Sequence, residues 1–160
     1  MRDVTIRPAR FDDAATILGL IQQLADYEKR PADVTASISD IEQSLFSKSA
    51  TAHALICEVA GEAMGYAVYF YNYSTWLGKN GLYLEDLYVS PQCRGQGVGK
   101  ALIKHVAQIA VAKSCGRFEW CVLDWNQPAI DFYRSIGAKA QDEWVIYRLD
   151  GDDLLRFANQ

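Results

Sequence analysis

The stretch from Gly81 to Ser114 constrains the fold of this 160-residue chain more than any other. It opens with residues 81–89, which are rich in Leu, Tyr and Val and predict a strand. A turn at 90–92 leads into residues 94–100, where glycine alternates with other residues. Apolar side chains then recur at steps of three and four residues from Val98 onward, which predicts an amphipathic helix. A strand, a glycine-rich loop and a helix therefore follow one another directly.

This loop has the chemistry of an anion-binding site. The backbone N–H groups at a helix start have no partner inside the helix, and the helix dipole places positive charge there. Glycine lets the backbone approach a phosphate closely and adopt a positive φ, whereas three glycines at a helix start only cost stability if no ligand binds. We predict that the loop cradles a pyrophosphate. The residues of this cradle are Arg94, Gly95, Gln96, Gly97, Val98, Gly99 and Lys100.

Two familiar phosphate-binding motifs do not fit the loop. A Walker A loop needs a glycine five residues before its Gly-Lys pair and a Ser or Thr after it, but Arg94 and Ala101 occupy those positions. The dinucleotide fingerprint needs a glycine where this chain has Lys100, and a strand directly before its first glycine. The loop is therefore neither a P-loop nor a dinucleotide fingerprint.

Length and composition exclude several classes of protein. A chain of 160 residues predicts one domain over 1–160, and the net charge of −4 disfavours a nucleic-acid partner. No apolar run is long enough to span a membrane, and the N-terminus has no signal-peptide core. The cysteines are scattered and the chain has only two histidines, so we expect no metal site and a reducing, cytoplasmic location. The cysteines are Cys57, Cys93, Cys115 and Cys121.

Hydrophobic periodicity and turn residues predict the remaining elements. We expect Ser39 to cap its helix as part of a capping box with Glu42, and a hairpin turn at Gly61-Glu62. The fold class is α/β, of the α+β mixed-sheet kind, with helices on the faces of the sheet. Strands are predicted over 3–7, 52–59, 64–73, 81–89, 117–123 and 144–149, and helices over 14–27, 39–46, 98–114, 129–135 and 152–157.

Four segments carry a family resemblance. The loop has the form R/Q-x-x-G-x-G/A from Arg94, which resembles the acetyl-CoA loop of the GNAT N-acetyltransferase superfamily. Residues 24–28, 76–89 and 125–133 resemble the spermidine/spermine acetyltransferase branch of that superfamily, which also includes enzymes acting on thialysine-like amino acids. The resemblance covers almost the whole chain. It implies the GNAT fold with a splayed central sheet, acetyl-CoA as the acetyl donor, and a homodimer.

The resemblance also implies where the coenzyme binds. The pantetheine arm is expected in the splay, paired with the backbone near Leu87 and Val89. Ile136 replaces a basic residue that relatives use near the coenzyme phosphate, which puts that contact in doubt. The cofactor-binding residues implied outside the loop are Leu87, Tyr88, Val89, Asn126, Pro128 and Ala129.

Acetyl transfer to an amine requires an acid for the departing thiolate. A phenol has a pKa of about 10, close to the value of about 8.5 for a thiol, so proton transfer between them is only mildly uphill. The family places its proton donor at the residue that matches Tyr133. The residues alone leave a packing role for Tyr133 equally open, because its neighbour Phe132 is also aromatic.

The amine must also lose a proton, and Glu85 is the candidate base, acting through water. It lies on the predicted central strand among Leu82, Leu84 and Leu87, where a lone buried charge is expensive unless it faces a cavity or a cation. Asp86 would point to the opposite face if the strand were regular. The alternative is that Glu85 is a solvent-facing edge residue.

Acidic and aromatic residues at the site favour a cationic acceptor. Ser74 replaces an acid that the polyamine enzymes usually carry, so a shorter diamine or an amino acid with a side-chain amine is as well supported as a polyamine. The bland alternative is that the acids at 142–143 are a solvated loop and Trp144 is a core residue. The substrate-binding residues implied are Tyr27, Glu28, Trp76, Glu85, Asp86, Glu119, Trp120, Cys121, Asp142 and Trp144.

Three other functions are compatible with parts of this pattern. A protein lysine or N-terminus could be the acceptor, which would require an open groove. The chain could bind acetyl-CoA as a sensor without turnover. A covalent route through Cys93, beside Arg94, is disfavoured because no histidine neighbours it in the sequence. We therefore expect direct attack of a small-molecule amine in a ternary complex.

Overall fold

The computed structural model describes residues 3–160. The chain forms two compact units, the first ending at Cys121 and the second running from Val122 to Gln160. The prediction of a single domain over 1–160 stays a prediction. Within residues 3–160, no helix is both long and apolar enough to cross a bilayer.

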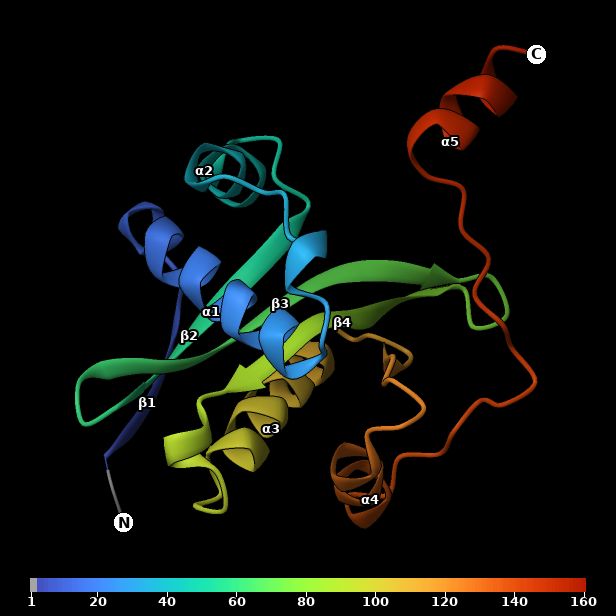
Figure 1. Ribbon diagram of the computed structural model, residues 1–160. Coiled ribbons are helices and arrows are strands. Elements are labelled where there is room, and N and C mark those ends of the chain that lie inside the picture. The colour runs from blue at the N-terminus through green and yellow to red at the C-terminus, as the bar shows by residue number, and fades with distance from the viewer. Residues whose placement is uncertain (1–2) are drawn as a thin grey trace. The chain divides into compact units, whose positions relative to one another are not determined.

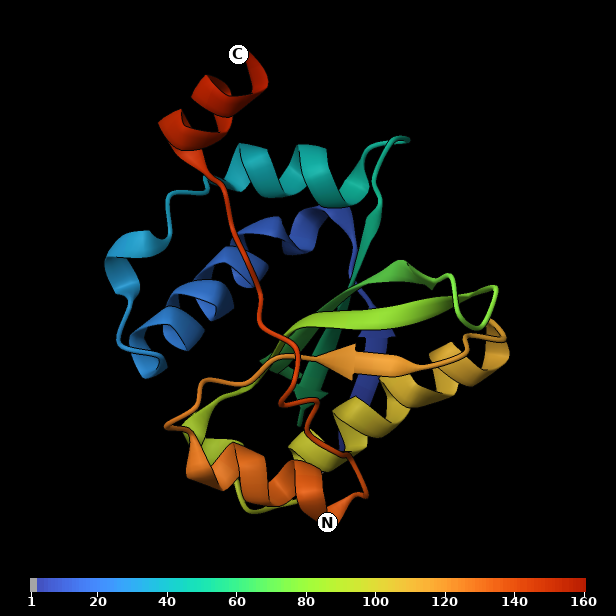
Figure 2. The same ribbon diagram turned by 90° about the vertical axis from the view of Figure 1, so that its right-hand side faces the viewer.

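The first unit is built on a five-stranded mixed sheet with the strand order β1-β2-β3-β4-β5. The first four strands pair antiparallel in succession, whereas β4 and β5 pair parallel. Helices cover both faces of this sheet (Figures 1 and 2), which confirms the predicted fold class. The strands are β1 (Val4–Pro8), β2 (Ala52–Val59), β3 (Glu62–Ser74), β4 (Lys79–Val89) and β5 (Phe118–Trp120).

The helices of this unit lie on opposite faces of the sheet, α1 and α2 on one and α3 on the other (Figure 2). The α1 face is closed by a buried cluster that includes Ile17, Ile41, Tyr66 and Tyr88. On the other face α3 buries the apolar stripe that the sequence predicted, because its residues recur at helical spacing. The helices are α1 (Ala14–Tyr27), α2 (Ile38–Phe46) and α3 (Val98–Ala112), with short 3₁₀ turns η1 (Phe11–Asp13), η2 (Pro31–Asp33) and η3 (Pro91–Cys93).

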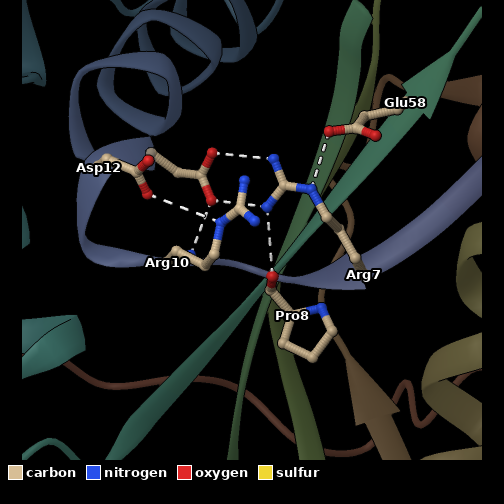
Figure 3. A network of polar contacts seen from close by, with 6 residues as sticks. Arg7, Pro8, Arg10, Asp12 and Glu58 are labelled. Carbon is tan, nitrogen blue, oxygen red and sulfur yellow. Dashed lines mark hydrogen bonds and ion pairs between the residues drawn. The ribbon is translucent and has the colours of Figure 1, made fainter. Parts of the chain in front are cut away.

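A polar network ties the start of α1 to the edge of the sheet (Figure 3). Arg7 on β1 donates two hydrogen bonds to Asp13, with N···O distances of 2.7 and 3.0 Å, and a third of 2.8 Å to Glu58 on β2. The Arg10 amide also donates to Asp13 over 2.7 Å. These bonds, led by the one from Arg7, lower the pKa of Asp13 and keep the buried carboxylate charged. The network therefore fixes where α1 leaves β1.

Strand β4 contains an irregularity that the sequence did not reveal. Val68 on β3 faces Asp86, but the next residue, Tyr69, faces Leu84, so Glu85 is an extra residue in a β-bulge. The regular strand on which the predicted alternation of Glu85 and Asp86 depended is therefore not present at this point. The parallel ladder with β5 runs only as far as Leu84 and Trp120 among the described residues. Because β4 continues to Val89 beyond this ladder, the predicted splay of the sheet is confirmed.

The second unit contains two helices, α4 (Gln127–Ser135) and α5 (Gly151–Ala158). The predicted strand over 144–149 is absent, and this segment is extended chain outside any sheet. Its Trp, Val, Ile, Tyr and Leu residues favour a strand, but a strand exists only where another strand offers its backbone groups. Sequence composition cannot supply that partner.

Most elements begin or end within about two residues of their predicted bounds, and three differences concern a cap, a turn and a strand length. Ser37, not Ser39, caps α2, and its capping-box partner is Asp40. The β2–β3 turn is formed by Ala60 and Gly61, both at positive φ, and Glu62 already belongs to β3. The strand predicted over 117–123 is limited to the short β5, because its pairing with β4 ends at the bulge.

Candidate active site

The glycine-rich loop has the geometry of an anion cradle. Gly97 is the N-cap of α3 with a φ of 79°, and its carbonyl accepts the first helical hydrogen bond, from Ala101 N over 2.9 Å. Helix geometry leaves the amides of Val98, Gly99 and Lys100 outside the intrahelical ladder. A Cβ atom added at Gly97 would meet nothing within 4 Å, so no neighbouring side chain or backbone fills the space beside this residue. A pyrophosphate fits this arrangement.

Arg94 does more than add charge to the loop. Its guanidinium carbon lies 4.6 Å from the ring centre of Tyr27 and 5.6 Å from that of Tyr88. Its Nε atom donates a hydrogen bond of 3.1 Å to the Val89 carbonyl. Cation–π contacts and this bond connect the predicted coenzyme loop to the C-terminal end of α1. Gln96 and Lys100 are exposed beside it.

Among the described residues, the ladder between β4 and β5 ends at Leu84, and the part of β4 beyond it lies next to the cradle in sequence. Leu87 and Val89 belong to this part of β4, and η3 connects it to the loop. Backbone groups that are not used in a ladder can bond an extended ligand. The predicted place of the pantetheine arm, along the splay, is therefore compatible with the sheet.

Asp86 is held by a buried tyrosine. The Tyr66 hydroxyl on β3 donates a hydrogen bond of 2.8 Å to Asp86 Oδ2, and Tyr66 is fully buried. Burial raises the pKa of Asp86, whereas the bond from Tyr66 acts in the opposite sense. Burial, followed by the charge of Asp86, raises the pKa of Tyr66, so this hydroxyl stays a donor.

Two of the predicted acceptor-pocket acids, Glu28 and Asp86, interact. Burial raises the pKa of Glu28, and the negative charge of Asp86 raises it further, while Arg30 acts against both. A carboxylate whose charge is disfavoured by a neighbouring carboxylate is stabilised when a cation binds in the space beside both. Tyr27, at the end of α1, contacts the same region through Arg94. The structure thus gathers three predicted substrate residues on the α1 side of β4.

Glu85 and Trp76 are exposed. Glu85 is the extra residue of the bulge, and Trp76 lies in the β3–β4 turn with 80% of its surface accessible. The assignment of Glu85 as the base stays a prediction. Ser74, where polyamine enzymes carry an acid, is buried and accepts hydrogen bonds from Leu77 N and from Arg117. Position 74 is therefore engaged in holding the β3–β4 turn.

The predicted residues of β5 form polar contacts of their own. Glu119 Oε2 lies 4.0 Å from Arg117 Nη1, and Asn72 donates to Glu119 Oε1 over 3.4 Å. The Cys121 thiol accepts a hydrogen bond of 3.0 Å from the Tyr83 hydroxyl. Trp120 packs on Phe118 with 4.9 Å between ring centres. These three residues line the end of β5, and their contact with substrate stays a prediction.

The second unit carries the remaining predicted residues. The Asn126 side chain caps α4 by accepting from Ala129 N over 3.4 Å, and Pro128 lies in the first turn, as predicted. Tyr133 is on α4, with its ring centre 5.6 Å from that of Phe132. Asp142 and Trp144 are exposed, so the structure does not bear out the alternative of a core role for Trp144. The catalytic role of Tyr133 stays a prediction.

Sequence reasoning missed Tyr66 and Gln23. Gln23 on α1 accepts hydrogen bonds from the Tyr88 hydroxyl over 3.3 Å and from Ser90 over 3.4 Å. One signal was available: counting the antiparallel register outward from the β3–β4 turn brings Tyr66 opposite this part of β4. The bulge shifts the register by one residue, and no sequence pattern marks its position.

Comparison with known proteins identifies relatives along the whole chain. The family model described as the acetyltransferase (GNAT) family matches residues 20–138. Thialysine N-epsilon-acetyltransferase of Sus scrofa is 39% identical over 100% of both chains. Spermidine/spermine N(1)-acetyltransferase-like protein 1 of Homo sapiens is 32% identical over 96% of this chain and 23% of its own length. Among solved structures, an integron cassette protein from the mobile metagenome of V. cholerae aligns with a TM-score of 0.84, 28% identity and 98% coverage of both chains.

Proposed function

This chain belongs to the acetyltransferase (GNAT) family, and from that premise we propose that it transfers the acetyl group of acetyl-CoA to a primary amine of a small cationic molecule. A cationic acceptor is supported by the interaction of Glu28 with Asp86, two half-buried carboxyl groups whose pKa values are raised. A cationic acceptor relieves their mutual repulsion. Neutral or anionic acceptors do not.

Among cationic acceptors, we favour an amino acid with a side-chain amine, such as thialysine or lysine, or a short diamine. The relative from Sus scrofa, which matches along its entire length, is named for thialysine. In this chain Ser74 is buried against Arg117, in place of the acid expected for long polyamines. The negative charge that a distant second ammonium group would need is therefore missing at this position.

We assign the chemical roles as follows. The amides at the start of α3 bind the pyrophosphate of the coenzyme, and the part of β4 beyond Leu84 binds its pantetheine arm. Glu85, through a water molecule, accepts the proton that the ammonium group loses. The amine nitrogen forms a bond to the acetyl carbon, the carbon–sulfur bond breaks, and Tyr133 donates its phenolic proton to the thiolate. The second proton that the nitrogen loses as the amide forms restores the Tyr133 phenol, and the proton held by Glu85 passes to water.

An amine screen tests this function. Purified protein is incubated with acetyl-CoA and one amine at a time, and released thiol is followed. We expect turnover with thialysine, lysine or short diamines, with a higher kcat/KM than for spermidine, spermine or lysine-containing peptides. Turnover of peptides alone supports the protein acetyltransferase alternative. Acetyl-CoA binding without turnover of any amine at millimolar concentration contradicts the proposal and supports a sensor.

We also propose that the protein is a homodimer. Within the second unit taken by itself, residues 144–149 and α5 carry exposed apolar side chains, which favours their being covered by another protein surface. Sedimentation equilibrium tests this, and a monomer at micromolar concentration contradicts it. The exposed apolar residues are Trp144, Val145, Ile146, Tyr147, Leu149, Leu154, Leu155 and Phe157.

A cytoplasmic location is the remaining proposal. All four cysteines are free, and Cys57 and Cys93 are buried. Free thiols persist in a reducing compartment. Fractionation of cells that produce the protein tests this location.

A further inference from the structure

We propose that Tyr66 is a positioning residue for acetyl transfer: its buried hydroxyl holds the Asp86 carboxylate in place and in its charged form, so that Asp86 can bind the ammonium group of the acceptor. This inference rests on the proposed function and extends it to a residue that has no expected contact with substrate.

The geometry of the Tyr66 side chain supports this role. Tyr66 has no accessible surface and belongs to the buried cluster between α1 and the sheet, together with Ile17, Leu20 and Ile56. A close-packed ring of this kind has one position, and therefore its hydroxyl has one position too. The bond of 2.8 Å to Oδ2 has the usual length for a hydroxyl donor and leaves the carboxylate with further acceptor capacity.

The charges around Asp86 show why the hydroxyl matters. Burial disfavours the charged form of Asp86, and Glu28, at the end of α1, contributes a like charge nearby. Arg30 lowers the pKa of Glu28, and the Arg94 guanidinium lies over the rings of Tyr27 and Tyr88. The hydrogen bond from Tyr66 favours a charged Asp86. Without it, Asp86 takes up a proton more readily and loses its attraction for an ammonium group.

Tyr66→Phe removes this hydroxyl and keeps the ring. A hydrogen bond to a charged group contributes enough that we expect KM for the amine to rise about tenfold at neutral pH, with KM for acetyl-CoA unchanged. The pKa of Asp86 should rise in the variant, so the acidic limb of kcat/KM for the amine should move to higher pH. The defect should shrink as the pH rises, because Asp86 then becomes charged in both proteins.

Tyr69→Phe is the matched control. It removes a hydroxyl from the same strand, three residues away, from a largely buried tyrosine whose ring stacks on His53 at 5.2 Å. A general loosening of β3 would affect both variants. We expect the control to keep the wild-type KM for the amine and the wild-type position of the acidic limb.

Asp86→Asn provides a second test should Tyr66→Phe fold poorly. Asn keeps an acceptor for the Tyr66 hydroxyl but carries no charge. We therefore expect a high KM for the amine at every pH, and a pH profile of kcat/KM without the acidic limb that Asp86 gives the wild type. An unmoved acidic limb in folded Tyr66→Phe, or an unchanged amine KM in Asp86→Asn, overturns the role of Tyr66 while wild-type turnover still supports the proposed function. A folded wild-type protein that acetylates no amine overturns both.

Discussion

At the scale of single residues, Gly97 has the clearest expected effect on coenzyme binding. Its positive φ and the open space at its Cβ position both follow from its place before α3. We expect Gly97→Val to raise the dissociation constant of acetyl-CoA at least about tenfold, because the side chain would occupy the space for phosphate and strain the backbone. Isothermal titration calorimetry measures this effect. Binding of normal affinity would rule out the cradle.

The control for Gly97→Val is Gly61→Val. Gly61 has nearly the same backbone conformation, with a φ of 82°, and a Cβ atom there also meets nothing within 4 Å. Strain alone should lower the stability of both variants by a similar amount, on the order of 1–3 kcal/mol. Only the variant in the loop before α3 should lose affinity for acetyl-CoA.

Tyr133 is the residue with the largest expected effect on turnover. Tyr133→Phe removes the proposed proton donor and should lower kcat about 10²- to 10⁴-fold, the usual range for general acid catalysis. The affinity for acetyl-CoA should stay the same, since the ring is retained. Tyr73→Phe, at a position on β3 that is 63% exposed, is the control. A wild-type kcat in Tyr133→Phe removes Tyr133 from the acid role.

At this scale, the sequence predicted a functional feature when its residues are neighbours in the chain. The glycines before α3 are recognisable because a backbone that must bind an anion has few alternatives. The pairing of Tyr66 with Asp86 was not predictable, because it joins residues twenty positions apart. It also depends on a bulge that no single residue marks.

At the scale of elements, the N-terminal end of α2 gives a direct test. The Ser37 hydroxyl accepts from Asp40 N over 3.1 Å, and Asp40 Oδ2 accepts from Ser37 N over 2.7 Å. We expect Ser37→Ala to lower the free energy of unfolding by about 1 kcal/mol, the usual loss for an N-cap. Ser39→Ala, two residues on, should have little effect because Ser39 is already inside the helix. Urea unfolding of both variants measures the difference.

The same helix shows why element boundaries were harder to predict than the elements themselves. Two overlapping patterns, Ser37 with Asp40 and Ser39 with Glu42, both have the spacing of a capping box. Only the path of the chain before α2 decides between them. The strand predicted over 144–149 was wrong for a related reason, because strand-forming residues make a strand only when the edge of another strand is present. Strands within the hairpins were predicted well because their partners are adjacent in the chain.

At the scale of the whole molecule, Asp13 changes the stability of the folded protein with pH in one direction, and Glu28 and Asp86 change it in the other. The pKa of Asp13 is lowered by Arg7, so its stabilising effect is present above the unfolded value of about 3.8 and is lost as the pH falls below it. The pKa values of Glu28 and Asp86 are raised, so these two groups favour the folded state most below about pH 4 and less as the pH rises. The ionised pair therefore weakens the folded protein at neutral pH.

Asp86→Asn should accordingly stabilise the protein while it impairs amine binding. We expect its melting temperature to exceed that of the wild type by a few degrees at pH 7–8, with the difference disappearing near pH 4. Asp13→Asn should show the reverse: a lower melting temperature at neutral pH, and a deficit that shrinks as the solution is acidified. Differential scanning calorimetry across this range measures both. A destabilised Asp86→Asn at pH 8 would contradict the assignment of Asp86 as a strained, buried charge.

Glu85, the extra residue of the β-bulge, affects how segments of β4 can be exchanged between this chain and its relatives. Even-numbered residues point to one face in 79–84 and to the other face in 86–89, because Glu85 has no paired residue on β3. The pairs Val68–Asp86 and Tyr69–Leu84 put Leu84 and Asp86 on opposite faces, as adjacent residues of a regular strand would be, so removing Glu85 would leave both halves of the strand on their present faces. A chimaera joined within β4 should therefore work when the residues that replace Leu84 and Asp86 keep opposite faces, whether or not it carries the extra residue between them.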